Sequence, residues 1–374
     1  MLIKRKYMIL LPVVAFAVLL IAGFVVSFLS LKAVPSEDWV ELRNPAHILS
    51  GESTRRFTKL LNQHFVLGST FNQIERGMLW NLTGDLGPGV RAGCPEWLFL
   101  ADELTLHPDR NKSAEFRAAL AEQLASRLKE RGISLLVAVV PDKTRIENAH
   151  LCGLRRSALF DERVVNWLAL LKPHGIETLN LTAVLDSTPG ERYYRTDTHW
   201  NETGAYAAAG SVAARLSDLQ WAALAADGTL PEAVRIERSG DLVHLAGLDG
   251  LPGFLRPGME RVQATEVAPI TVESDDLFGD AGLPAIALIG TSYSRNSNFV
   301  PFLEHKLGEP VANLAKDGGG FSGAATAFFA GATFRDNPPK VVVWEIPERV
   351  IEMPVEEAER KWLEMLVKGK LQAM

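Results

Sequence analysis

Five short apolar runs after residue 130 most constrain what this chain can fold into. Each is long enough for a β-strand, and helix-length stretches lie between several of them. The runs are residues 134–140, 176–181, 285–289, 310–314 and 341–346. Strands that alternate with helices along a chain are typical of a sheet with helices packed on its faces. The sequence therefore predicts an α/β fold with a doubly wound, mostly parallel sheet.

Helical patterns surround these strands. Residues 111–131 carry apolar side chains at helical spacing and are followed by Gly132, a common stop signal. Further helices are predicted at residues 57–71, 160–171, 202–216, 298–307 and 355–371. Residues 81–95 are rich in Gly and Pro and are expected to form a loop, followed by an edge strand at 97–100.

Residues 218–280 interrupt the alternation. They contain Gly, Pro and acidic residues, with short strand-like pieces such as residues 233–236. We expect an insertion with loops or a small hairpin, not a separate domain.

The N-terminus predicts a membrane anchor. Lys4, Arg5 and Lys6 precede residues 7–31, an uncharged stretch of 25 residues. A bilayer core needs about 20 apolar residues, whereas the apolar core of a signal peptide has only about 7–15. Basic residues before the stretch place the N-terminus in the cytoplasm. We expect a cytoplasmic tip and anchor at 1–32 and an extracytoplasmic domain at 33–374; a cleaved signal peptide is the alternative.

The two cysteines, Cys94 and Cys152, have a spacing that fits no metal motif. Outside the cytoplasm such a pair can form a disulfide. Two unpaired structural thiols are the alternative.

The overall charge gives a weaker constraint. The formal net charge is −6, from 45 acidic and 39 basic residues, and no dense basic run is present. This argues against a nucleic-acid partner. It leaves a polyanionic substrate open, because a local basic groove can exist on a mildly acidic protein.

Two polar segments carry residues suited to nucleophilic catalysis. Asp197 and His199 lie two positions apart in a loop before a helix, where a carboxylate can orient one imidazole nitrogen. Ser292 follows the apolar run 285–289, at the place where open α/β sheets bind ligands. We predict that Ser292 is the nucleophile, His199 its general base and Asp197 the orienting acid.

Each of these residues also has a structural alternative. Ser292 fits a turn or a helix cap, and Ser294 is the nearest rival nucleophile. His199 can be a loop histidine that packs on Trp200, and Asp197 a loop carboxylate. No metal site is expected, since a metal would need a further cluster of ligands that the sequence does not show.

The paired motifs resemble a known family. Residues 197–200 (Asp-Thr-His-Trp) and 290–293 (Gly-Thr-Ser-Tyr) resemble the signature of the alginate O-acetyltransferase family, of the AlgJ/AlgX type. Residues 97–104 and 141–143 match it further. The resemblance implies an SGNH-hydrolase-like three-layer fold. It is closer to the AlgJ type, because the chain has no room for the added carbohydrate-binding module of the AlgX type.

The resemblance also implies a function. It points to acetylation of an exopolysaccharide such as alginate in the bacterial periplasm, by a protein held in the inner membrane. A membrane-bound O-acyltransferase would supply the acetyl group, and no cofactor is expected. Two alternatives remain, a carbohydrate acetylesterase that uses water as acceptor and a non-catalytic scaffold of a secretion complex.

Four residues are predicted to contact substrate. Lys143 and Arg349 each follow a strand and could attract an acidic sugar, although a surface ion pair explains them equally well. Tyr293 adjoins the nucleophile. Asn313 resembles a polar position of the SGNH superfamily. Oxyanion donors are expected from the Ser292 turn or from the glycine-rich loop 313–320, which a plain turn would also explain.

Overall fold

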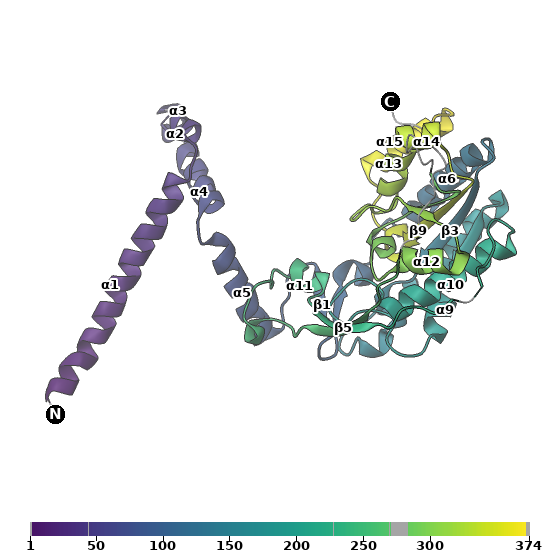
Figure 1. Ribbon diagram of the computed structural model, residues 1–374. Coiled ribbons are helices and arrows are strands. Elements are labelled where there is room, and N and C mark those ends of the chain that lie inside the picture. Colours follow the sequence, from purple (N-terminus) through teal and green to yellow (C-terminus); the bar gives the residue numbers. More distant parts are fainter. Residues whose placement is uncertain (1, 44, 227, 269, 271–282, 372–374) are drawn as a thin grey trace, which may run out of the picture. The chain divides into compact units, whose positions relative to one another are not determined.

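The computed structural model describes residues 2–43, 45–226, 228–268, 270 and 283–371. They form two compact units (Figure 1). The first contains the residues up to Thr83 together with Gly247–Arg256, and the second contains the remainder.

The first unit is helical. Its elements are α1 (Leu2–Lys32), α2 (Ser36–Leu42), α3 (Pro45–Leu49), α4 (Glu52–His64), α5 (Gly68–Thr83) and the short 3-10 helix η5 (Gly253–Leu255). The predicted single helix at 57–71 is wrong, because the backbone becomes extended at Phe65 and separates α4 from α5. The turn that follows is held by the Val66 amide, which donates to Ser30 Oγ at 3.1 Å.

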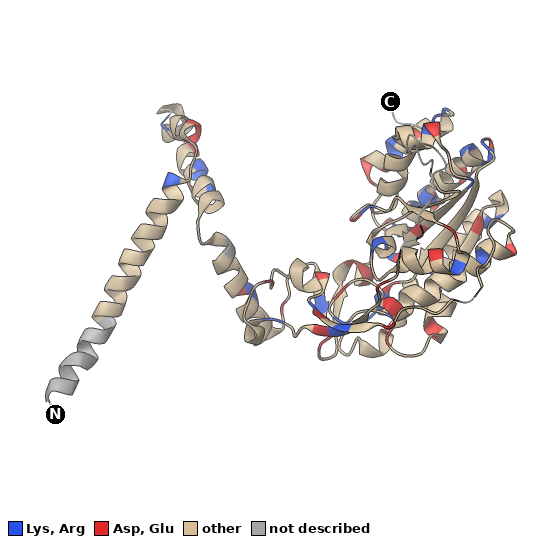
Figure 2. Cartoon of the chain, viewed as in Figure 1, with Lys and Arg blue, Asp and Glu red and all other residues tan. Residues whose placement is uncertain are grey.

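Helix α1 is long and apolar enough to cross a membrane. Its segment Val13–Lys32 has a mean hydropathy of 2.7, and only 6% of this segment is buried. In Figure 2 the described part of α1 shows no charged residue before Lys32. A core helix of a soluble protein would bury such a surface, so the exposure is compatible with a single-pass membrane anchor.

The second unit is built on a five-stranded sheet, in which every neighbouring pair is parallel. The strands, in spatial order, are β4 (Glu177–Asn180), β3 (Ser134–Val140), β9 (Val341–Pro347), β7 (Ile286–Ile289) and β8 (Val311–Asn313). All five strands predicted from the apolar runs are present, and the predicted parallel sheet is confirmed. Every carboxyl end therefore lies at the same edge.

Helices cover both faces of this sheet. On one face, Val137 and Val139 of β3 pack with α6 (Arg110–Lys129), α8 (Arg163–Leu171), α13 (Gly323–Ala330) and α15 (Glu357–Val367). On the other, Leu136 and Ala138 pack with α9 (Thr182–Ser187), α10 (Glu202–Asp218) and α12 (Phe299–Leu307). Burial on both faces explains why the central strands β3, β7 and β9 are almost continuously apolar. The predicted three-layer α/β architecture is confirmed.

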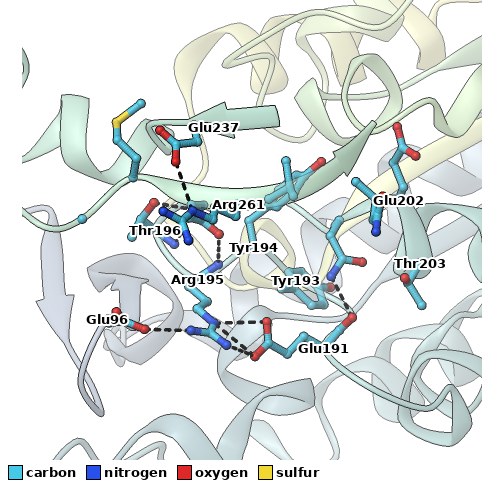
Figure 3. A pocket seen from close by; sticks show the side chains of 16 residues that line it. Glu96, Glu191, Tyr193, Tyr194, Arg195, Thr196, Glu202, Thr203, Glu237 and Arg261 are labelled. Atoms are coloured by element: carbon cyan, nitrogen blue, oxygen red, sulfur yellow. Dashed lines mark hydrogen bonds and ion pairs between the residues drawn. The ribbon is translucent and has the colours of Figure 1, made fainter. Parts of the chain in front are cut away.

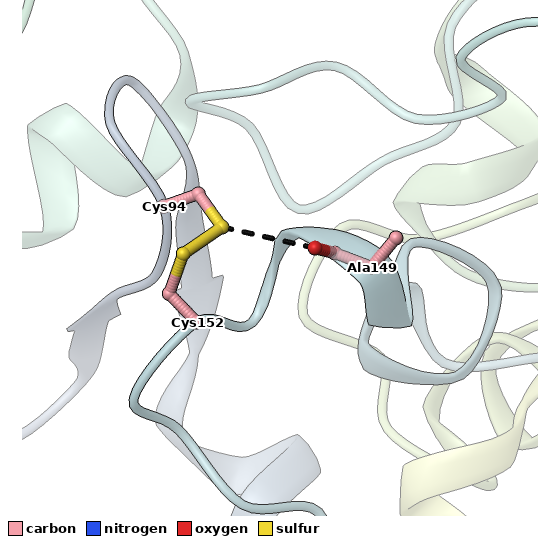
Figure 4. The surroundings of a disulfide bond; sticks show 3 residues. All are labelled: Cys94, Ala149 and Cys152. Carbon is pink, nitrogen blue, oxygen red and sulfur yellow. Dashed lines mark hydrogen bonds between the residues drawn. A yellow bond between two sulfur atoms is a disulfide. The ribbon is translucent and has the colours of Figure 1, made fainter.

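A separate small sheet precedes α6. Strand β1 (Val90–Ala92) pairs antiparallel with β2 (Leu98–Leu100), so the region expected to be all loop contains a strand. The predicted disulfide is confirmed, since Cys94 between these strands is bonded to Cys152 (Figure 4).

The insertion contains the expected hairpin. Strands β5 (Val234–Arg238) and β6 (Glu260–Ala264) pair antiparallel, and α11 (Asp241–Leu245) follows β5. We call β5, β6 and α11 with their linking residue Gly240 the inserted hairpin. The end of the predicted insertion, at 271–280, lies outside the described residues.

Candidate active site

Ser292 lies at the carboxyl edge of the sheet, where β7 ends and the short 3-10 helix η6 (Ser292–Arg295) begins. Buried Glu345 on the adjacent strand β9 holds this turn. Its carboxylate accepts the Thr291 amide at 2.6 Å and the Ser294 hydroxyl at 3.0 Å. At Gly290, a Cβ would lie 2.5 Å from Glu345 Oε2, so the close approach requires glycine. Two neighbouring strands thus fix a half-buried serine.

Asp197 and His199 come from the loop before α10. Asn201 caps that helix, because its side chain accepts the Gly204 amide at 3.0 Å. His199 Nδ1 lies 2.7 Å from Asp197 Oδ1, and His199 Nε2 lies 2.6 Å from Ser292 Oγ. The structure therefore brings the three predicted catalytic residues into one hydrogen-bonded chain, with the geometry of an acid–base–nucleophile triad.

The Asp197 carboxylate is the most heavily bonded group of the three. Oδ1 accepts both the His199 amide, at 2.9 Å, and the His199 ring. Oδ2 accepts Arg238 and the Asp241 amide. Burial by itself would raise the pKa of Asp197, but the hydrogen bond from His199 and the charge of Arg238 outweigh it and hold this pKa below its ordinary value. Asp197 is thus kept ionised, as an orienting acid requires.

Comparison with known proteins agrees with this geometry. The family model of the SGNH hydrolase-like domain of acetyltransferase AlgX matches residues 90–348. The chain is 31% identical to the “Probable alginate O-acetylase AlgJ” of Pseudomonas aeruginosa over 338 residues, which cover 87% of this chain and 85% of that protein. The chain belongs to the AlgX-type SGNH hydrolase-like acetyltransferase family.

Solved structures of AlgJ and AlgX also match this chain. The O-acetyltransferase domain of Pseudomonas putida AlgJ matches with a TM-score of 0.61 and 27% identity, over 75% of this chain and 99% of that domain. Pseudomonas aeruginosa AlgX matches with a TM-score of 0.53 and 25% identity, over 75% of this chain and 67% of AlgX. The chain is accordingly an O-acetyltransferase with an SGNH-like fold.

Two residues of the acetyltransferase site were missed by the sequence analysis. Arg238, the last residue of β5, pairs with Asp197. Asp241, at the start of α11, accepts the Thr198 amide at 2.6 Å, and its other carboxylate oxygen lies 3.6 Å from His199 Nδ1. Both belong to the inserted hairpin. No local pattern distinguishes them from other charged residues of the insertion, because their role depends on where the hairpin folds.

Lys143 has a different position from the one predicted. Its side chain is completely buried, and Nζ donates to the carbonyl oxygens of Leu98, Arg195 and Asp197 at 2.6, 2.9 and 2.9 Å. Burial lowers the pKa of Lys143 to about 8. The prediction that Lys143 attracts an acidic sugar is wrong. We call residues 195–201, which carry Asp197 and His199, the catalytic loop. Lys143 instead ties this loop to β2.

Tyr293 is also buried, so the prediction that it contacts substrate is wrong. Its hydroxyl donates to the Thr198 carbonyl at 3.0 Å, and its ring lies edge-on to the His199 ring, with 5.0 Å between centroids. Arg349 lies behind it. The Arg349 guanidinium is 3.4 Å from the Tyr293 hydroxyl and 3.8 Å from Glu103 Oε1, and its side chain is 13% exposed.

Asn313, at the end of β8, is exposed beside the nucleophile turn. Its amide nitrogen donates to the Ser294 carbonyl at 3.0 Å, and its oxygen accepts the Ala315 amide. The loop that follows β8 is hydrogen-bonded to the same turn, because the Lys316 amide donates to the Gly290 carbonyl at 3.1 Å. The glycine-rich loop 313–320 therefore runs next to Ser292.

A cavity of about 710 Å³ is lined by residues 193–196 and 201–203 and by the strands of the inserted hairpin. In Figure 3, Arg195 reaches both Glu96 and Glu191, and Arg261 reaches Glu237. The glutamates that line it outnumber its arginines, and none of the three triad residues is among its lining residues. This cavity is electrostatically unsuited to an acidic sugar.

Asp241 changes one further expectation. Asp197, His199 and Asp241 offer ligand atoms that lie within 4.8 Å of one another, so the structure adds a third candidate ligand to the Asp197–His199 pair where the sequence showed no further cluster. However, both oxygens of Asp197 already accept hydrogen bonds, and Arg238 brings a positive charge to one of them. These contacts fit a charge-neutralised triad better than a cation site.

Proposed function

We propose that Ser292, His199 and Asp197 catalyse acetyl transfer to hydroxyl groups of an acidic exopolysaccharide such as alginate. The hydrogen-bonded chain from Asp197 Oδ1 through His199 to Ser292 Oγ, at 2.7 and 2.6 Å, is the observation that carries this proposal. The names of the AlgJ relatives suggest the polymer.

The chemistry proceeds in two half-reactions. Ser292 Oγ attacks the carbonyl carbon of an acetyl ester while His199 Nε2 takes the serine proton, and the alcohol of the donor leaves with that proton. A sugar hydroxyl then attacks the acetyl-serine, His199 takes the sugar proton, and the proton returns to Ser292. Asp197 stabilises the protonated imidazole in both steps.

Each tetrahedral intermediate needs donors for its oxyanion. We propose the Ser292 turn and the loop 313–320 as the source. The hydrogen bonds of Lys316 and Asn313 to the turn support this assignment, because they bring the loop next to the nucleophile. Gly318 and Gly320 have φ of +64° and +56°, a conformation that favours glycine, and without a Cβ their backbone can approach a ligand closely. Asn313 and Arg349 remain the proposed substrate contacts.

We propose that residues 1–32 form a cytoplasmic tip and inner-membrane anchor, and that residues 33–374 lie in the periplasm. The basic residues before the apolar span and the disulfide support this orientation. A membrane-bound O-acyltransferase would then be the acetyl donor. Tethering both proteins in one membrane raises the effective concentration of each for the other.

The test is to follow the acetyl group with the full-length protein, an acetyl ester of p-nitrophenol and alginate. We expect a transient gain of one acetyl on the peptide containing Ser292, which alginate discharges by accepting the acetyl on its own hydroxyls. Ser292→Ala should reduce transfer about 10³-fold or more, with unchanged folding. Transfer at the wild-type rate by folded Ser292→Ala would exclude this nucleophile.

Discharge to water at the same rate with and without polymer would favour an acetylesterase instead. A matched control is Ser187→Ala, because Ser187 is an exposed residue of α9 whose hydroxyl donates to the Val184 carbonyl at 3.1 Å, outside the loop that carries Asp197 and His199.

A further inference from the structure

We infer that Arg238 and Asp241 of the inserted hairpin are positioning residues that set, in opposite directions, the pH at which the triad becomes active. The inference rests on the proposed triad. It assigns a function to a segment that would otherwise be a surface elaboration of the α/β fold.

Arg238 contacts Asp197, and Asp241 lies next to His199. Arg238 pairs with Asp197 Oδ2, while the Asp241 carboxylate lies 3.6 Å from His199 Nδ1 on the side away from Ser292. His199 therefore faces two carboxylates and, through Asp197, one guanidinium.

The geometry around Arg238 is well defined. Its guanidinium carbon lies 4.2 Å from the centre of the Tyr194 ring, and 27% of its side chain is exposed. The Tyr194 amide in turn donates to the His199 carbonyl at 3.2 Å. A planar cation between an aromatic ring and a carboxylate is confined in two directions, so it limits how Asp197 can rotate.

Asp241 is fixed by the catalytic loop itself. Its Oδ1 accepts the Thr198 amide at 2.6 Å, and its own amide donates to Asp197 Oδ2 at 3.2 Å. Its side chain is still 43% exposed, which leaves its second oxygen next to the histidine ring and near solvent. The start of α11 is thus hydrogen-bonded to Asp197 and Thr198, the two residues that precede His199.

Charge determines the expected direction. A protonated imidazole is stabilised by a nearby negative charge and destabilised by a nearby positive one. The negative charge of Asp241 should therefore keep His199 protonated, and so inactive as a base, up to a higher pH. The positive charge of Arg238 should have the opposite effect. The other charged or titratable groups near this ring lie further from it or on its far side: Tyr293 edge-on, Lys143 on the Asp197 carbonyl, and Arg349 behind Tyr293.

The test uses full-length protein in detergent and phenylmethylsulfonyl fluoride, followed by mass spectrometry of the Ser292 peptide across pH 4–9. Ser292 Oγ bonds to sulfur, fluoride leaves, and His199 takes the serine proton. Labelling therefore reports the free base without requiring a polymer or an acetyl donor. A failure of acetyl transfer to alginate would contradict the proposed function and leave this readout intact.

We expect the midpoint of the acid limb to move up by roughly 0.5–1 pH unit in Arg238→Gln and down by a similar amount in Asp241→Asn. Arg238→Lys should retain most of the wild-type midpoint, because it keeps the charge, but should label more slowly because it loses the planar contact with Tyr194.

Arg235→Gln and Glu232→Gln are the matched controls, because both residues are exposed and lie at or just before β5, away from the triad. Their midpoints should equal that of the wild type. Circular dichroism identifies any variant that has unfolded. If Arg238→Gln is unfolded, the midpoints of Arg238→Lys and Asp241→Asn are compared instead. Midpoints that stay together, or that move in the same direction in Arg238→Gln and Asp241→Asn, would overturn the inference.

Discussion

The two halves of the catalytic site are held in different ways. The nucleophile half is Ser292 with its turn. Side chains of two strands of the same sheet hold this turn: Glu345 on β9 through the Thr291 and Ser294 groups, and Asn313 on β8 through the Ser294 carbonyl. The acid–base half is the loop from Arg195 to Asn201. It is held by polar contacts from segments far away along the chain.

These contacts reach the loop from several directions. Lys143 binds the Arg195 and Asp197 carbonyls, and Glu260 of β6 accepts the amides of Arg195 and Thr196 at 2.6 and 2.8 Å. The comparison teaches that the nucleophile is supported by neighbouring strands of the same sheet, whereas the acid–base loop depends on the inserted hairpin and one buried lysine. Disturbing those supports should therefore affect catalysis without affecting the sheet.

The largest effect is expected at Gly240, where the inserted hairpin is closest to the catalytic loop. A Cβ there would lie 2.0 Å from the Thr196 carbonyl oxygen. Gly240→Ala must therefore displace the loop that carries Asp197 and His199. A displacement of about 1 Å costs on the order of 100-fold in rate, and steady-state kinetics should show it mainly in kcat.

Gly258→Ala is the matched control, because a Cβ at Gly258 meets nothing within 4 Å. It should retain the wild-type rate. An equal loss of rate in both variants would mean that the loss does not depend on the close approach of Gly240 to Thr196, which would contradict this prediction.

A smaller effect on rate and a larger one on stability are expected for Lys143→Met. The change leaves three carbonyls without their donor, which should lower the free energy of unfolding by about 2–3 kcal/mol at pH 7. The rate should fall about tenfold as the loop loosens.

The pH dependence gives a sharper test of the same residue. Burial lowers the pKa of Lys143 to about 8 in the folded protein, below its ordinary value of about 10.4. Between these values the unfolded chain binds more protons, so this group's contribution to stability rises with pH and is lost as the pH falls through about 8. From pH 7 to 9.5 the wild type should gain about 2 kcal/mol relative to Lys143→Met in denaturant titrations. Exposed Lys172→Met should show no such gain.

The smallest effect on rate is expected for the disulfide. Replacing Cys94 and Cys152 together by serine should lower the free energy of unfolding by about 2–4 kcal/mol, because the bridge closes a long loop with a sequence separation of 58. Activity at 25 °C should change by less than about twofold, since the bridge joins the turn between β1 and β2 to residue 152 and includes no triad residue. A tenfold loss of activity would place the bridge among the supports of the acid–base half.

The same division explains what the sequence could predict. Strand patterns are local, so the sheet, the position of Ser292 at its edge and the helix after His199 followed from short segments. The motifs 197–200 and 290–293 added the pairing of the two halves. Arg238, Asp241 and the inward orientation of Lys143 depend on contacts across 41, 44 and 54 positions of sequence. No periodicity reports such contacts.

Tyr293 shows the limit most clearly. Its place in the Gly-Thr-Ser-Tyr motif suggested a residue facing the substrate. In the structure the 3-10 turn directs Ser292 outward and Tyr293 inward, where it packs between His199 and Trp200. In this tight turn, neighbouring residues such as Ser292 and Tyr293 point in different directions.

The short distance between Ser292 Oγ and His199 Nε2 has a kinetic consequence. With the hydroxyl already bonded to its base at 2.6 Å, formation of the acetyl-enzyme requires no rearrangement triggered by the acceptor. In the proposed mechanism, turnover should then follow a ping-pong sequence, in which donor and polymer never have to be bound together. The yield of modified polymer would then be decided by the partition of each acetyl-enzyme between a sugar hydroxyl and water, and therefore by the concentration of polymer at the half-buried serine.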